Sequence, residues 1–200
     1  MGHKFNPGQM AKLDSPARRK LLPPEATVNK LGINPGSVVA DIGCGTGYFT
    51  FPLAGAVGME GLVLGVDISE EMVKEARRRW EQEHGAPDNV RFLLSRENGL
   101  PLEGQRVDLV FMSAVLHELE EPQVFFREID RILRSQGKVV VVEWKKEPME
   151  MGPPEQERLS MEETSGLLAA CGFATLEVLD LGEAHYGVIA QQQSTKGCSK

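Results

Sequence analysis

The stretch that decides the fold runs from Val38 to Thr50 and reads VVADIGCGTGYFT. Its first five residues are apolar apart from one acid, as in a short strand that is buried on both faces. Three glycines follow at positions 43, 45 and 47, and glycine permits both positive φ and close approach of a ligand to the backbone. The first N–H groups of a helix after them would face the same point. The stretch therefore predicts a strand, a ligand-binding loop and a helix.

Two common phosphate-binding loops do not match this stretch. The dinucleotide fingerprint GxGxxG requires its third glycine where this chain has Tyr48. A P-loop ends in Gly-Lys-Ser or Gly-Lys-Thr, which is absent here. Both differences argue against a nucleotide pyrophosphate as the ligand.

The Asp-x-Gly-x-Gly-x-Gly pattern of the loop resembles the first motif of class I S-adenosylmethionine (SAM)-dependent methyltransferases, the seven-stranded Rossmann-like family. The similarity is to the small prokaryotic "type 11" kind and runs from about residue 30 to residue 190. SAM carries an ammonium and a sulfonium and no pyrophosphate, so an acid at the strand tip suits it. The resemblance implies SAM as cofactor, S-adenosyl-L-homocysteine as product, and cofactor contacts from Asp41, Gly43, Cys44, Gly45, Thr46 and Gly47.

A second apolar run, Leu62 to Asp67, also ends in an acid. In the family that it resembles, the acid at this place binds the ribose, and a carboxylate can accept hydrogen bonds from both hydroxyls at once. The alternative is an acid that merely opens the helix expected from Ser69. The resemblance assigns Asp67 and its neighbour Ile68 to the cofactor.

A third predicted strand, Val90 to Leu94, leads into a loop where relatives commonly hold the adenine amino group with an acid. The usual aspartate position falls on Arg96 in this chain, which departs from the family pattern. The adenine contact is therefore expected from Glu97 and Asn98, the next two residues of the loop, and the alternative is that both are solvated polar residues of the loop.

Residues 108–118 resemble the fourth motif of the family, a central strand whose carboxyl end approaches the cofactor. Ligands bind at the carboxyl ends of such strands, which places Ser113 near the cofactor and His117 and Glu118 near the chemistry. An imidazole is suited to act as a base at neutral pH. The alternative is that His117 orders the loop, as the resemblance implies for many relatives. Displacement at a sulfonium needs a base only when the acceptor must lose a proton. No metal site is expected.

The rest of the chain completes a doubly wound α/β pattern. A helical stripe (Val124, Phe125, Ile129, Ile132, Leu133) is expected to end at Gly137, and Lys138 to Trp144 is expected to form a fifth strand. The runs 175–181 and 186–191 are joined by only four residues, which forces them antiparallel. The prediction is a seven-stranded, mostly parallel sheet with a C-terminal antiparallel hairpin and helices on both faces.

The chain divides into three segments. Residues 1–37 are rich in proline and predict an N-terminal helical arm, with helices at 17–22 and 25–31. The resemblance suggests that the arm is a lid over cofactor and substrate, and a purely structural arm is the alternative. Residues 38–191 form the SAM-binding methyltransferase domain, and residues 192–200 a disordered tail. The irregular segment 145–159 is expected to be a substrate lid.

Composition limits the possible partners and location. The net charge of −7 argues against general nucleic-acid binding, which requires clustered Lys and Arg. No apolar run reaches membrane-spanning length and the N-terminus has no signal-peptide core, so a cytoplasmic protein without membrane contact is expected. The three widely spaced cysteines, Cys44, Cys171 and Cys198, agree with a reduced compartment.

The sequence leaves the methyl acceptor open. A small-molecule acceptor is expected, apolar or quinone-like, with a protein side chain as an alternative. The signature of amino-methylating nucleic-acid enzymes is missing at Ser113, and arsenite methylation would require converging cysteines. Two other functions stay open, a non-catalytic SAM-binding regulator or scaffold and a nicotinamide-dependent Rossmann oxidoreductase. Tyr48 and the C-terminal hairpin argue against the oxidoreductase.

Overall fold

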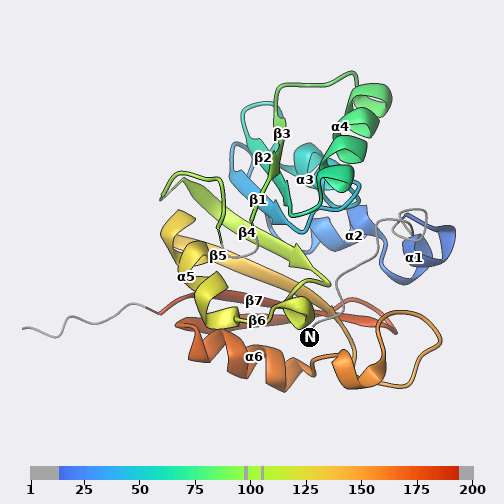
Figure 1. Ribbon diagram of the computed structural model, residues 1–200, viewed down its shortest axis with the longest axis vertical. Helices are drawn as coiled ribbons and strands as arrows, with labels where there is room; N and C mark the ends of the chain where they lie inside the picture. Colours follow the sequence, from blue (N-terminus) through green and yellow to red (C-terminus); the bar gives the residue numbers. More distant parts are fainter. Residues whose placement is uncertain (1–13, 97–98, 105, 194–200) are drawn as a thin grey trace, which may run out of the picture.

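The computed structural model describes residues 14–96, 99–104 and 106–193. Seven strands form one sheet in the order β3-β2-β1-β4-β5-β7-β6 (Figure 1). The neighbours from β3 to β5 are parallel, and β7 is antiparallel to both β5 and β6. The predicted mixed sheet and its terminal hairpin are therefore confirmed. The strands are β1 (Val38–Ile42), β2 (Leu62–Asp67), β3 (Val90–Leu94), β4 (Val107–Ser113), β5 (Leu133–Trp144), β6 (Phe173–Asp180) and β7 (His185–Gln192).

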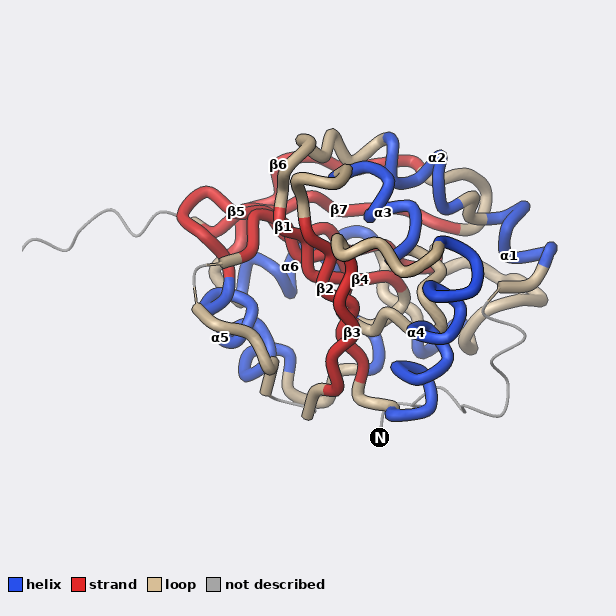
Figure 2. Tube along the Cα trace, turned by 90° about the horizontal axis from the view of Figure 1, so that it is seen from above, coloured by secondary structure: helices blue, strands red, loops and turns tan. Residues whose placement is uncertain are grey.

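Helices cover both faces of the sheet, with α1 to α4 on one side and α5 and α6 on the other (Figure 2). None of the helices in the described ranges combines the length and the hydropathy needed to cross a bilayer. The α-helices are α1 (Pro16–Leu21), α2 (Pro24–Asn29), α3 (Thr50–Val57), α4 (Glu70–His84), α5 (Pro122–Ile132) and α6 (Met161–Ala170), and the short 3-10 turns are η2 (Leu116–Glu118) and η3 (Glu155–Glu157).

Two hydrophobic cores follow from the alternation of side chains along each strand. Val140 and Val142 of β5 pack in the core that contains α3 and α4 residues. Val139 and Val141, the alternate positions, pack in the core that contains α5 and α6 residues. The four valines have no exposed surface, so β5 is buried on both faces, as the apolar run predicts.

The strand order reverses next to β1. β1 pairs with β2 on one side and with β4 on the other, so the chain leaves β1 toward opposite edges of the sheet. Such a switch point opens a crevice at the carboxyl ends of the strands. The glycine loop after β1 and the loop after β4 both begin there.

Several predicted boundaries move by a few residues. The helix predicted after the glycine loop begins at Thr50, which leaves Pro52 in the first turn, where its missing N–H costs nothing. The expectation that the helix after Val124 ends at Gly137 is wrong. α5 ends at Ile132, because Leu133 already pairs with β4 and Gln136 has a φ of 69°, which no right-handed helix accepts.

Other boundaries agree closely with the sequence. The capping box of Ser160 and Glu163 begins α6 as its motif indicates. β7 ends at Gln192, one position past the predicted end of that strand. Residues 194–200 of that tail lie outside the described part of the chain, as do residues 1–13 of the arm.

Phe111→Ala is expected to destabilise the fold strongly. Phe111 lies on β4 with no exposed surface, and its ring centre is 4.8 Å from that of Phe49. Loss of this fully buried aromatic ring should lower the free energy of unfolding by about 3–5 kcal/mol, measured by urea denaturation. Leu176→Ala on the edge strand β6, 54% exposed, is the control and should change it by less than about 0.5 kcal/mol. Equal losses in the two variants would contradict this account of the core.

Candidate active site

The first acid of the site, Asp41, is buried at the carboxyl end of β1. Its side chain is 2% exposed, and Oδ2 accepts a hydrogen bond of 2.6 Å from the hydroxyl of Thr50. Burial raises the pKa of Asp41 to about 7, and the charge of Asp67 adds to the increase, whereas Thr50 and Arg18 oppose it. A carboxylate stripped of water in this way is stabilised by a cation.

The second acid, Asp67, ends the neighbouring strand β2. Its Oδ2 accepts a hydrogen bond of 2.9 Å from the backbone N–H of Gly45, and its Oδ1 accepts one of 2.9 Å from that of Ser69. Burial raises the pKa of Asp67, while these two hydrogen bonds act against the increase. Asp67 therefore orders the glycine loop and contacts the N-cap residue of α4, while its predicted contact with a ribose stays a prediction.

Each of the three loop glycines has a positive φ, between 53° and 92°. A Cβ on Gly43 would lie 2.4 Å from the Val115 side chain, and one on Gly47 would lie 2.4 Å from the Phe51 ring. The spacing of the motif is thus required by conformation and by packing. Several loop N–H groups are already engaged, because Gly43 and Cys44 donate to Val66 and Gly47 donates to Cys44. A pyrophosphate would find these donors occupied, which agrees with the mismatch to the dinucleotide fingerprint.

The other predicted cofactor residues are placed differently. Cys44 is buried, and its sulfur would lie 3.4 Å from a Cβ on Gly65, so the thiol belongs to the core and only the Cys44 backbone lies in the loop. Thr46 is also buried and accepts a long hydrogen bond of 3.4 Å from Arg79. Ile68 is 49% exposed and provides apolar surface beside Asp67. The predicted adenine contacts, Glu97 and Asn98, lie outside the described residues.

The loop after β4 contacts the glycine loop and leads to His117, the candidate base. Ser113 ends β4 and is half-buried, and Ala114 has a φ of 57°. The contact between Val115 and Gly43 then brings this loop against the glycine loop. η2 follows directly and carries His117 and Glu118 at the same edge of the sheet.

His117 is held by a buried carboxylate that the sequence analysis did not select. Its Nδ1 lies 2.8 Å from Oε2 of Glu143, and its backbone N–H donates to Oε1 at 3.3 Å. The side chains are 7% and 1% exposed. Burial alone lowers the pKa of His117, but the hydrogen bond and charge of Glu143, with the charges of Glu118 and Glu157, raise it above its usual value. Glu118 thus acts on the imidazole through its charge.

The arm is fastened to the glycine loop. The hydroxyl of Tyr48 donates a hydrogen bond of 2.7 Å to the backbone carbonyl of Leu22. Leu22 itself is buried, with 1% of its surface exposed. The guanidinium of Arg18 lies over the same ring, 4.3 Å from its centre. Arg79 of α4 bridges the two parts from the other side, with an ion pair of 2.7 Å to Asp14 of the arm. The arm therefore lies against the site. Arg18 was not among the predicted site residues, and its place beside the glycine loop is seen only in the structure.

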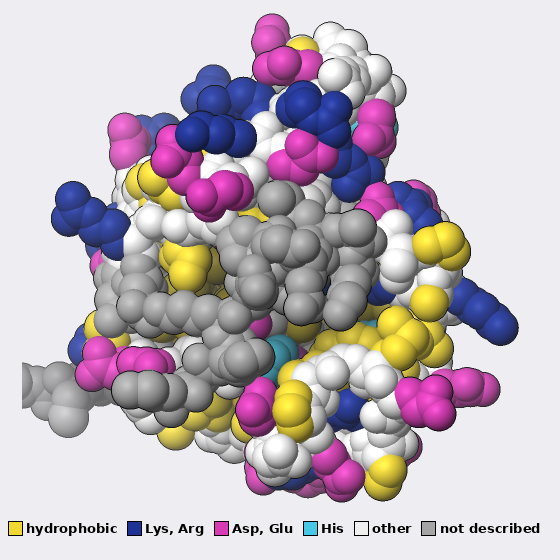
Figure 3. Space-filling model, turned by 45° about the vertical axis from the view of Figure 1, so that its right-hand side comes forward, with side chains coloured by type: hydrophobic (Ala, Val, Ile, Leu, Met, Phe, Trp, Pro, Cys, Tyr) yellow, Lys and Arg dark blue, Asp and Glu magenta, His cyan; other side chains and the backbone are white. Residues whose placement is uncertain are grey.

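The buried side chain of Arg158 holds the loop after β5 in place through hydrogen bonds, and Arg158 is 3% exposed. Its guanidinium donates to four carbonyl oxygens of this loop, those of Lys145, Glu147, Met151 and Pro153, at 2.7–3.3 Å. It also lies 5.8 Å from the centre of the Trp144 ring. The loop and α1 lie on the side toward which β4 points in Figure 1. Figure 3 shows hydrophobic side chains gathered beside this loop.

His185, the first residue of β7, is buried beside Trp144, with 4.1 Å between ring centres. Burial lowers the pKa of His185 to about 3, and the charges of Arg18, Arg158 and Lys145 contribute to the decrease. Within the described part of the chain its Nδ1 has no hydrogen-bond partner. His185 is therefore neutral at physiological pH.

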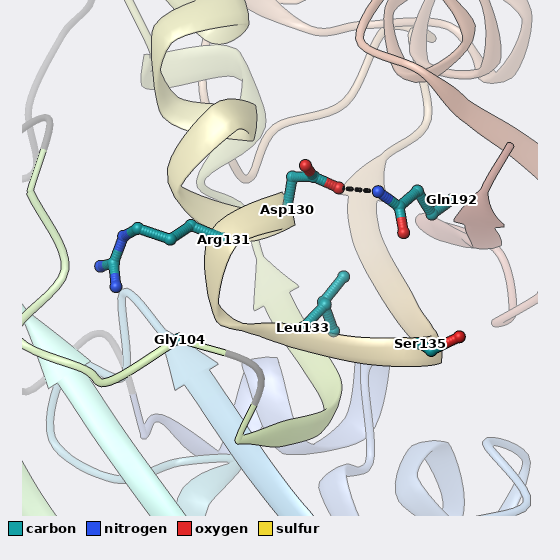
Figure 4. Close-up of a pocket in the computed structure, with 6 residues that line it drawn as sticks. All are labelled: Gly104, Asp130, Arg131, Leu133, Ser135 and Gln192. Carbon is teal, nitrogen blue, oxygen red and sulfur yellow. Dashed lines mark hydrogen bonds between the residues drawn. The ribbon is translucent and has the colours of Figure 1, made fainter. Parts of the chain in front are cut away.

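A separate hollow lies at the opposite end of the sheet (Figure 4). It is found where β5 begins and β7 ends, which is the amino end of the parallel strands. Ligands of such sheets bind at the carboxyl ends, so this hollow is not the predicted site. Its lining residues are Gly104, Asp130, Arg131, Leu133, Ser135 and Gln192.

Comparisons with known proteins agree with this site. A family model described as a methyltransferase domain matches residues 33–187. A SAM-dependent methyltransferase from Aquifex aeolicus has a similar structure, with a TM-score of 0.89, 35% identity, and coverage of 94% of this chain and 100% of the other. A putative type 11 methyltransferase from Sulfolobus solfataricus shares the fold at 23% identity, with a TM-score of 0.74 over 90% of this chain and 97% of the other.

Similar curated proteins are longer than this chain. The demethylmenaquinone methyltransferase of Lactococcus lactis is 34% identical over 117 residues, 58% of this chain and 46% of the relative. The arsenite methyltransferase of Halobacterium salinarum is 35% identical over 107 residues, 54% of this chain and 27% of the relative. This chain thus spans less than half the length of these two proteins. The family match over most of the chain decides against a nicotinamide-dependent oxidoreductase. The chain belongs to the methyltransferase-domain family and has the fold of class I SAM-dependent methyltransferases.

Proposed function

We propose that this protein transfers a methyl group from SAM to a small organic acceptor. The observation that carries the proposal is the pair of acids beside the glycine loop, the buried Asp41 and the half-buried Asp67. SAM is cationic at neutral pH, so it complements these carboxylates. Family membership and the similar Aquifex aeolicus methyltransferase support the same cofactor.

Each part of the cofactor has a residue suited to hold it. Asp41 would bind the ammonium, Asp67 the ribose hydroxyls, and Ile68 would cover the adenine with apolar surface. The adenine amino group stays assigned to Glu97 and Asn98, by resemblance alone. When bound, SAM supplies a methyl group on a sulfonium that is already activated for displacement. The protein's own task is to orient the acceptor and exclude water.

His117 is proposed to be the general base. Its Nδ1 is bonded to Glu143, so Nε2 is the ring nitrogen that would take the proton from the acceptor. Glu143 would hold the ring in place and stabilise it when protonated, as a carboxylate behind a histidine does in hydrolases. Glu118 would assist through its charge rather than by touching the acceptor. A base implies an acceptor that loses a proton, such as a phenol, an enol or an amine.

The placement of the cysteines favours an organic acceptor over arsenite. Cys44 belongs to the core on the α3 side of the sheet, and Cys171 packs against the core on the α6 side. The two thiols therefore do not converge, and Cys198 lies outside the described residues. Both described cysteines are free, which supports the further proposal of a reducing, cytoplasmic location.

The arm is proposed to be a lid over cofactor and acceptor. Two polar contacts, Tyr48 with Leu22 and Arg79 with Asp14, connect it to the loop and to α4. Breaking both contacts would release α1, the moving part of the proposed lid, while Leu22, Val28 and Leu31 keep the rest of the arm in the core.

A methyl-transfer screen tests the proposed reaction. The protein is incubated with SAM carrying a labelled methyl group and with separate pools of phenols, quinols, amines and arsenite. Transfer to an organic pool is the expected result. Cofactor binding without transfer to any pool would instead favour the non-catalytic regulator, and transfer to arsenite alone would contradict the acceptor class.

Asp67→Ala is expected to weaken binding of S-adenosylhomocysteine by more than about tenfold, the scale of losing charge-assisted hydrogen bonds. Calorimetric titration measures the change. Asp88→Ala removes an exposed acid far from the site and should leave the affinity as in the wild type. Unchanged affinity in Asp67→Ala would refute the placement of the ribose.

The affinity for S-adenosylhomocysteine should also depend on pH through Asp41. Its pKa of about 7 means that at lower pH a proton must leave before the ammonium can bind. The dissociation constant should therefore rise by about tenfold per pH unit below that pKa, and titrations in two buffers should detect proton release. Asp41→Asn should bind more weakly with no such slope. A flat profile in the wild type would exclude this role for Asp41.

Glu143→Gln should lower the pKa of His117, followed by NMR titration of the imidazole. Burial remains while the carboxylate is lost, so the pKa should fall below the usual value of about 6.5. In the wild type the raised pKa adds stability that is complete below pH about 6.5 and is lost as the pH rises through the folded-state pKa. The stability deficit of the variant should thus be larger at acidic than at alkaline pH. Glu150→Gln, an exposed change in the β5 loop, should alter neither quantity.

A further inference from the structure

We propose that Arg79 is a positioning residue that couples cofactor binding to the docking of α1 against the site. The inference rests on the proposed function, because it takes the glycine loop as the cofactor site and α1 as the moving part of the arm. Arg79 lies on α4 and contacts both the glycine loop and the start of the arm helix. It would therefore act on the reaction through these two segments, without touching the acceptor.

The guanidinium of Arg79 joins parts of the chain that are far apart in the sequence. Its Nη1 lies 3.4 Å from both the carbonyl oxygen and the hydroxyl of Thr46, in the middle of the glycine loop. Its Nη2 lies 2.7 Å from a carboxylate oxygen of Asp14, two residues before α1 begins. Its Nε donates to Glu83 of α4 at 2.9 Å, and the Arg79 side chain is 15% exposed. Because each nitrogen has its own partner, the guanidinium is held in one orientation.

The glycine loop is held by side chains of two elements that follow it. Asp67, at the end of β2, accepts a hydrogen bond from the N–H of Gly45, and Arg79 of α4 holds the next residue, Thr46. Glycine has more backbone freedom than other residues, so a loop with three glycines needs such contacts to keep one conformation. Because the same guanidinium reaches Asp14, a cofactor that stabilises this loop conformation would also stabilise the pairing of Arg79 with Asp14.

α1 is the part of the arm that this pairing can control. All six of its residues are described and none of them is buried, whereas three residues of α2 are buried. The position of α1 therefore depends on polar and cation–π contacts, those of Asp14 with Arg79 and of Arg18 with Tyr48. Such contacts contribute little free energy, so a cofactor that strengthens one of them shifts the population of α1 toward the docked form.

A purely structural role for Arg79 makes a different prediction. If Arg79 only stabilises α4, the cofactor should not change the docking of α1, and loss of Asp14 should not change the affinity for the cofactor. If Arg79 couples the two segments, each change must appear at the other end, because coupling between two sites is reciprocal. Measurements at both ends therefore separate coupling from structural support.

Limited proteolysis with trypsin measures the docking of α1. Trypsin cuts after basic residues, and mass spectrometry reports cleavage at the three of α1, Arg18, Arg19 and Lys20. Saturating S-adenosylhomocysteine should slow this cleavage in the wild type by at least about fivefold, and in Arg79→Met by less than about twofold. Arg78→Met is the matched control, because Arg78 lies on the same helix and pairs with Glu75 within it. It should keep the protection of the wild type.

Calorimetric titration with S-adenosylhomocysteine measures the coupling from the side of the cofactor. Asp14 pairs with Arg79 and with Arg19 of the arm, so its effect on the glycine loop should pass through Arg79. Asp14→Asn should weaken binding by about three- to fivefold in the wild type and by less than about 1.5-fold when Arg79 is already Met. A structural role alone would not produce this loss of additivity.

Three results would overturn the inference. Equal cleavage of α1 with and without bound S-adenosylhomocysteine would refute the coupling and leave the proposed function intact. Additive losses of affinity in the double variant would give Asp14 and Arg79 independent roles. If the wild type does not bind S-adenosylhomocysteine, the proposed function fails, and the coupling fails with it. A thermal unfolding scan of each variant confirms that the protein under test is folded.

Discussion

Burial raises the pKa of Asp41, and the charge of the half-buried Asp67 adds to the increase, so the rest of the site depends on two acids that lie close together. Parallel pairing of β1 with β2 brings both acids to one edge, and burial removes the water that would screen them. The protein answers with local donors, the hydroxyl of Thr50 for one acid and the N–H groups of Gly45 and Ser69 for the other. A bound cation would offset the negative charge that these donors leave. The negative charge of these two acids therefore affects both the stability of the fold and the binding of a cation.

Features that depend on neighbouring residues could be predicted from the sequence. The strand, glycine loop and helix around Asp41 follow from one short stretch, and so does the acid at the end of β2. The four-residue connection before β7 fixed the antiparallel hairpin, because no parallel crossover is that short. The end of α5 could not be predicted in the same way. The helical stripe includes Leu133, but pairing with β4 takes that residue into the sheet.

The site residues that the sequence analysis missed depend on contacts between distant segments. Glu143 and His117 are 26 positions apart and meet only because β5 lies beside β4. A signal was present, since Glu143 is an acid at the end of a run of four valines, where an unpaired charge would be costly. Arg18 carries no comparable signal, because the sequence around it resembles any basic helix. Its place is set by Leu22, which anchors the arm in the core.

The hydrogen bonds from Arg158 to the backbone of the β5 loop affect how the sequence of this loop can change in evolution. One guanidinium, that of Arg158, fixes the path of the loop through main-chain oxygens alone, so the path does not depend on which side chains the loop carries. Exposed positions such as Glu147 and Glu150 are free to be exchanged while the backbone keeps its course. Arg158 itself has no such freedom. A lineage could therefore change the chemistry displayed at this rim by single replacements, without paying for a new loop conformation each time.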